Sequence, residues 1–67
     1  MMRELTLKAL EQARKDRAEL CNTYFNLAVA AREKDEERAD RLLRAACDQA
    51  IIVEGLDRNI KLLKEES

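Results

Sequence analysis

Residues Tyr24–Ala31 read Tyr-Phe-Asn-Leu-Ala-Val-Ala-Ala, and seven of these eight residues are apolar. A helix over this segment has no polar face wide enough to meet solvent, so most of its circumference must be covered. A second apolar segment, Ala45–Val53, reads Ala-Ala-Cys-Asp-Gln-Ala-Ile-Ile-Val and can cover only one side. The sequence therefore predicts that the other side of the first segment faces another polypeptide.

Outward from these segments, apolar residues recur at three- and four-residue spacing, which predicts two helices. The first is expected over about residues 2–33 and the second over about 37–65, with a turn at about 33–37. No proline interrupts them. The stripes expected to face each other are Met2, Leu5, Ala9, Ala13, Leu20, Tyr24, Leu27 and Ala31, and Leu42, Ala46, Ala50, Val53, Leu56, Ile60 and Leu63.

The wholly charged segment Arg32–Arg38 separates the two helices. It is either the solvated middle of one long rod or a tight turn, in which Asp35 caps the second helix and Glu36 and Glu37 favour its dipole. A lone rod would leave both apolar segments in water, so we expect the turn. The predicted fold is all-α, an antiparallel two-helix hairpin resembling a coiled coil.

Folding the chain back at this point predicts which residues lie opposite one another. Arg17 is expected opposite Gly55, with carboxylates beside it, as a long side chain against a missing one. Cys21 and Cys47 are expected to lie out of register, too far apart for a disulfide, and to act as small core residues. The apolar stripe passes Gly55 in phase, so the second helix is expected to continue through it rather than end there.

Length and charge limit what the chain can be. We expect 67 residues to form one domain, residues 1–67, and a chain of this size usually needs a disulfide, a metal or a partner for stability. The formal net charge is −1, with no basic segment that would favour nucleic acid or an anionic membrane. No apolar run approaches the roughly 20 residues of a membrane span. The expected location is the cytoplasm, with both thiols reduced.

Few residues could carry chemistry. The sequence contains no His, the usual general base and commonest metal ligand, and its two Cys lack metal-type spacing. It contains no Gly-rich phosphate loop and no nucleophile-and-base set. We therefore expect no enzymatic activity, no catalytic or metal-binding residue, no cofactor and no small-molecule substrate.

The remaining signal is apolar surface outside the stripes that the hairpin itself can bury. Two occupants stay open: another helical protein, or a second copy that completes a four-helix bundle. We expect the stripes beside these inward-facing ones to contain Cys21, Ala28 and Cys47 among others. The residues predicted to bind the partner are Phe25, Val29, Leu43, Ile51 and Leu62.

The segment from about Leu27 to Leu63 has a charged turn and a second helix rich in Ala, Leu and Ile, and it contains the sequence Val53-Glu-Gly-Leu-Asp-Arg-Asn-Ile60. In these features it resembles the small co-chaperones of type III secretion needle subunits, the YscE type. The resemblance implies a helical hairpin that binds a tetratricopeptide-like chaperone and helps to keep a needle subunit from polymerising in the cytoplasm.

The segment Val53–Asp57 also resembles, more distantly, the Spo0E-like hairpin regulators of phosphorylated response proteins. Their Ser-Gln-Glu-Leu-Asp motif falls on Val53-Glu54-Gly55-Leu56-Asp57, where only Leu56 and Asp57 match. The resemblance implies a regulatory role through Asp57, but the motif's Ser, Gln and Glu are replaced, so phosphatase activity is not carried over.

Overall fold

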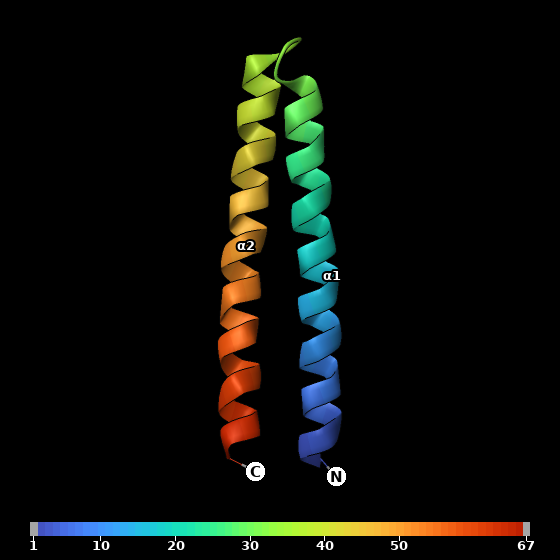
Figure 1. Ribbon diagram of the computed structural model, residues 1–67, viewed down its shortest axis with the longest axis vertical. Helices are drawn as coiled ribbons and strands as arrows, with labels where there is room; N and C mark the ends of the chain where they lie inside the picture. Colours follow the sequence, from blue (N-terminus) through green and yellow to red (C-terminus); the bar gives the residue numbers. More distant parts are fainter. Residues whose placement is uncertain (1, 67) are drawn as a thin grey trace.

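The computed structural model describes residues 2–66, which form two antiparallel helices joined by a short turn (Figure 1). Helix α1 spans Met2–Ala31 and helix α2 spans Glu36–Glu65. The hairpin measures 50 × 14 × 11 Å, and both ends of the chain lie at the end opposite the turn. The predicted all-α antiparallel hairpin is confirmed, and α2 continues through Gly55 as expected.

Asp35 caps the N-terminus of α2, as the charged segment predicted. Its side chain accepts a hydrogen bond of 3.1 Å from the backbone N–H of Arg38, and its own φ is −155°. Glu36 and Glu37 lie in the first turn of the helix, where negative charge favours the helix dipole. No residue in 2–66 has a positive φ, which explains how this turn forms without glycine.

The two helices meet along a seven-residue repeat, the spacing of a coiled coil. The residues of this seam are Arg3, Leu7, Leu10, Arg14, Arg17, Cys21, Tyr24, Ala28 and Ala31 on α1, and Ala39, Leu42, Ala46, Gln49, Val53, Leu56, Ile60 and Leu63 on α2. Every seam residue except the three arginines is buried or half-buried. The repeat thus accounts for most of the shielded residues, and those outside it are Ala13, Ala18, Leu20, Ala45 and Gly55.

The expected α1 stripe differs in part from this seam. Ala13, Leu20, Tyr24 and Ala31 are half-buried, as expected for a stripe that faces α2. The expectation is wrong for the rest of the stripe, and on α2 for Ala50, because those side chains are exposed: Met2, Leu5, Ala9, Leu27 and Ala50. Three seam positions of α1 are arginines, so a search for recurring apolar residues favours a neighbouring stripe.

The prediction that Arg17 lies opposite Gly55 is also wrong. Nη1 of Arg17 donates a hydrogen bond of 3.1 Å to Oε1 of Gln49, one and a half turns closer to the loop. Apart from its two chain neighbours and the backbone of its own helical turns, no atom lies within 4 Å of the position that a Cβ on Gly55 would occupy. Because α1 ends at Ala31, two residues earlier than expected, the fold-back point moves toward the N-terminus.

The two cysteines depart from expectation as well. Sγ of Cys21 donates to the carbonyl oxygen of Ala46 at 3.3 Å, so Cys21 lies level with the residue that precedes Cys47 rather than out of register. Cys21 is half-buried in the seam and not on a flanking stripe, whereas Cys47 is exposed and is not a core residue. Ala28, also expected on a flanking stripe, is buried in the seam with 2% exposure.

The core is a thin line of small side chains. Within residues 2–66 the buried apolar residues are Ala28, Ala39, Ala46 and Ile60, and three of these four are alanine. Alanine at the seam lets the helices approach closely but removes little apolar area from water. Neither described helix is long and apolar enough to cross a membrane.

Candidate protein-binding surface

An apolar groove of about 400 Å³ opens on one side of the seam, next to the turn. Three residues from the last turns of α1, Arg32 directly after it, and four residues from the first turns of α2 line it. They are Phe25, Ala28, Val29 and Arg32, and Glu36, Ala39, Asp40 and Leu43. The groove is therefore created by the hairpin itself, since neither helix supplies it alone.

The floor of the groove consists of alanine and its walls of larger apolar side chains. Ala28 and Ala39 are 2% and 4% exposed and allow the backbones to approach closely at this point. Phe25, Val29 and Leu43 stand beside them and keep 51%, 57% and 39% of their surface exposed. The arrangement is a shallow slot into which a side chain from a third helix can insert.

Charged residues of both signs form the rim. Arg32 lies on the α1 side of the groove, and Glu36 and Asp40 lie on the α2 side. An apolar centre with a charged margin is the usual organisation of a protein–protein interface. The two sides of the rim differ in charge. A polypeptide bound in the groove would need a carboxylate near α1 and a cation near α2 to pair with them.

Two rows of residues, one on each helix, run along this side of the molecule. Phe25 and Leu43 line the groove, and residues seven positions apart from them share their face. We call this pair of rows the groove-side row: Glu4, Glu11, Ala18 and Phe25 on α1 with Arg32 directly after the helix, and Glu36, Leu43, Ala50, Asp57 and Lys64 on α2. The groove-side row is apolar from Ala18 and Ala50 up to the groove. It is charged toward the open end, which is the end of the hairpin opposite the turn.

The structure brings together three of the five predicted partner-binding residues. Phe25, Val29 and Leu43 line the groove, from different helices. Ile51 and Leu62 are not among the lining residues; they are 66% and 52% exposed and occupy outward positions of the α2 repeat. The structure therefore places Ile51 and Leu62 outside the groove.

The opposite edge of the seam carries exposed apolar residues that the sequence analysis did not assign to a binding surface. Leu27 on α1 and Ile52 on α2 are 46% and 40% exposed. Both lie on the other side of the seam from Phe25 and Leu43 in the seven-residue repeat. With the correct seam, the seven-residue repeat in the sequence would have predicted that Leu27 and Ile52 lie exposed on this edge.

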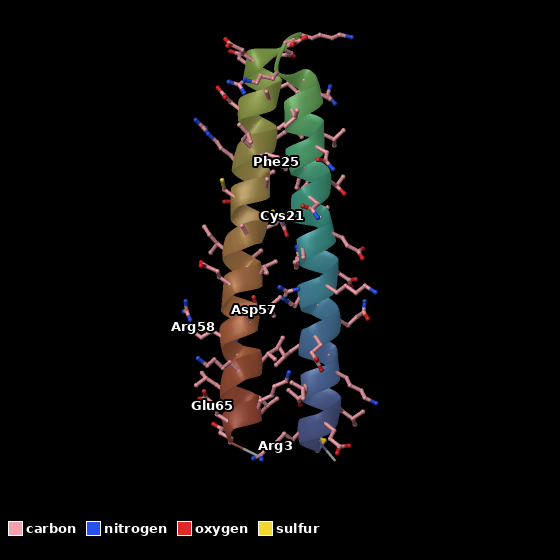
Figure 2. All side chains as sticks on the ribbon, in the orientation of Figure 1. Arg3, Cys21, Phe25, Asp57, Arg58 and Glu65 are labelled. Atoms are coloured by element: carbon pink, nitrogen blue, oxygen red, sulfur yellow. The ribbon has the colours of Figure 1, made fainter. Side chains whose placement is uncertain are left out.

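Polar seam contacts occupy the half of the hairpin farther from the groove. Nε of Arg14 lies 2.6 Å from Oδ1 of Asp57, and the side chains are 46% and 51% exposed. Figure 2 shows Asp57 on the side of α2 that faces α1, whereas Arg58 projects from the outer side. At the open end, Arg3 donates to the carbonyl oxygen of Glu66 at 3.2 Å. These contacts define which residues face each other across the seam.

The acidic residues and cysteines do not gather into a candidate metal site in the described part of the chain. Within residues 2–66 no group of three or more His, Cys, Asp or Glu side chains could hold a metal ion. The Asp57 carboxylate, which aligns with the regulator motif, is engaged by Arg14.

Comparison with known proteins gives no relative. No family model matches the chain, and neither a curated protein nor a solved structure matches it.

Proposed function

We propose that this protein is a small helical interaction module that binds a helix of another polypeptide chain in the groove beside its turn. The observation that carries the proposal is the exposure of Phe25, Val29 and Leu43 around a floor of buried alanine. An amphipathic helix laid across such a groove buries apolar side chains at three-, four- and seven-residue spacing.

The surface area of the free hairpin supports the proposal. Its accessible surface is 5598 Å² for a 7.7 kDa chain. A compact monomer of this mass exposes about 4,300 Å², so the hairpin exposes roughly 1,300 Å² more than a compact fold would. A specific interface of standard size buries about 800 Å² on each partner. The excess surface is thus large enough to contain one.

The groove walls supply affinity and the rim supplies orientation. Fully burying a side chain such as Phe or Leu contributes about 1.5–3 kcal/mol, and each wall residue is already partly covered, so each adds roughly 1 kcal/mol on binding. Arg32, Glu36 and Asp40 remain near solvent, where charges influence the orientation and rate of association more than the affinity.

A photoreactive side chain tests this proposal in the cell that makes the protein. A photoreactive phenylalanine analogue in place of Phe25 is expected to form a covalent adduct with a second polypeptide on irradiation. The matched control is the same analogue at the neighbouring residue Asn26, which is exposed on the outer side of α1. Equal adducts at both positions, or none at position 25, contradict the proposal.

A narrower proposal rests on the resemblance to type III secretion co-chaperones rather than on the groove. In it the bound helix belongs to a tetratricopeptide-like chaperone in the cytoplasm, where Cys21 and Cys47 stay as thiols. The adduct at position 25 tests this directly, because its partner chain can be identified by peptide mass spectrometry. An adduct with a protein of another fold contradicts this narrower form and leaves the interaction module intact.

A further inference from the structure

We propose that the occupant of the groove is a second copy of this chain, related by a two-fold axis parallel to the length of the hairpin. The two turns then lie at the same end of a four-helix bundle. This inference rests on the proposed function, because it requires the groove to be a binding surface and then names its occupant.

The area of the hairpin face fits such a dimer. The molecule is 50 Å long and 14 Å wide, so one broad face projects about 700 Å² even before its side-chain relief is counted. Two such faces in contact reach the size of a standard stable interface. The formal net charge of −1 places almost no repulsion between two copies.

The groove-side row makes the face complementary to itself. With the axis along the hairpin, α1 of one copy lies against α2 of the other copy, and residues at the same distance from the turn face each other. Within each copy α1 and α2 are paired in the same way. Phe25 of one copy then packs against Leu43 of the other, and Ala18 against Ala50. Each pair occurs twice, as a two-fold interface requires.

Two of the three charged layers outside the apolar ones pair opposite charges in the same arrangement. Arg32 of one copy meets Glu36 of the other beside the turn, and Glu4 meets Lys64 at the open end. Between them lies a layer with Glu11 and Asp57, where each Asp57 is already paired with its own Arg14 at 2.6 Å. The rim charges therefore supply the carboxylate near α1 and the cation near α2 that the groove demands.

The opposite orientation does not satisfy the pattern. If the turns lay at opposite ends, the apolar half of each face, around Phe25 and Leu43, would cover the charged half of the other. Charged side chains would then lose water without a partner, which is costly. The uneven distribution of apolar residues along the row thus selects the same-end arrangement.

Mass measurement tests the occupant and the face. The purified full chain is expected to have the mass of a dimer at micromolar concentration by light scattering. Leu43→Glu is expected to raise the dimer dissociation constant at least about 100-fold, because the buried charge enters the interface twice. Ile51→Glu, the same change at an outward position of α2, is expected to leave the mass unchanged. Ile52→Glu, on the opposite edge, is also expected to leave a dimer.

A distance measurement tests the orientation and does not depend on a variant that destabilises the hairpin. Lys34 lies in the turn and is exposed, so Lys34→Cys, combined with Cys21→Ala and Cys47→Ser, carries one spin label per copy. Same-end packing predicts a label-to-label distance within about 30 Å, given helix separations of 8–10 Å. Opposite-end packing predicts a distance near the 50 Å length of the hairpin.

The outcomes separate this inference from the proposed function. A dimer with a short label distance that Leu43→Glu dissociates supports both. A monomer, a long distance, or a dimer that only Ile52→Glu dissociates overturns the same-end dimer through the groove. A cellular adduct at position 25 with a different protein, together with a monomeric purified chain, overturns the second copy as occupant but leaves the interaction module standing. A monomer with no adduct at position 25 overturns both.

Discussion

Nε of Arg14 on α1 lies 2.6 Å from Oδ1 of Asp57 on α2, and this contact bridges residues 43 positions apart in the chain. Both side chains are about half exposed. Solvent screens such a pair, so its geometry matters more for the register of the hairpin than for its stability.

The first prediction concerns this pair. A double-mutant cycle with Arg14→Ala and Asp57→Ala is expected to give a coupling energy of about 0.2–1 kcal/mol, measured by urea unfolding. The coupling is expected to fall in 1 M salt, where the Debye length is about 3 Å. Arg58→Ala, on the outer side of α2, is the control. A coupling of several kcal/mol would contradict the solvent-screened pair described here.

The second prediction concerns the cap of α2. Asp35→Ala removes the side-chain acceptor for the N–H of Arg38 and is expected to lower the free energy of unfolding by about 1 kcal/mol. Asp35→Asn keeps an acceptor oxygen and is expected to retain most of the stability. Thermal unfolding followed by circular dichroism distinguishes the two variants. Equal stability of Asp35→Ala and the parent chain would show that the cap is not required.

The third prediction compares two isoleucines of α2 with opposite surroundings. Ile60 is 9% exposed in the seam, whereas Ile51 is 66% exposed on the outer side. Ile60→Ala is expected to cost about 2–4 kcal/mol, a large part of the stability of so small a core. Ile51→Ala is expected to change the free energy of unfolding by less than about 0.5 kcal/mol. Urea unfolding of both variants measures the difference, and similar losses would refute the assignment of the seam.

The sequence was sufficient to predict the hairpin because its local signals agree. The charged run contains Asp35, a favourable cap, followed by Glu36 and Glu37 in the first helical turn. Apolar residues at three- and four-residue spacing on both sides, broken once in the first helix around Arg17, then indicate two long helices. Each signal depends only on neighbouring residues, so it can be identified without knowing the tertiary contacts.

The seam and its register were harder to predict because they depend on contacts across the hairpin. Arg14 and Arg17 occupy seam positions, where their long stems pack and their charged ends find Asp57 and Gln49. Because these positions are not apolar, the apolar pattern does not include them and places the expected seam nearer to Leu27. An error of two residues in the end of α1 accompanied the wrong partner for Arg17, which lies beside Gln49 and not Gly55. The groove residues Phe25, Val29 and Leu43 were still identified, because their apolarity does not depend on the register.

The last prediction uses Gly55 to test how much of the α2 surface is free. Gly55 lies in the interior of α2, and apart from its two chain neighbours and the backbone of its own helical turns nothing lies within 4 Å of where its Cβ would be. Gly55→Ala is therefore expected to raise the free energy of unfolding by about 0.5–1 kcal/mol, since alanine loses less backbone entropy in a helix. Asn59→Ala, one turn further along α2, serves as a control for helix propensity without glycine. Thermal unfolding at two protein concentrations measures both changes. If Gly55→Ala instead lowers stability, and does so more strongly at high concentration, another chain must lie against the outer side of α2, which the groove-side dimer does not allow.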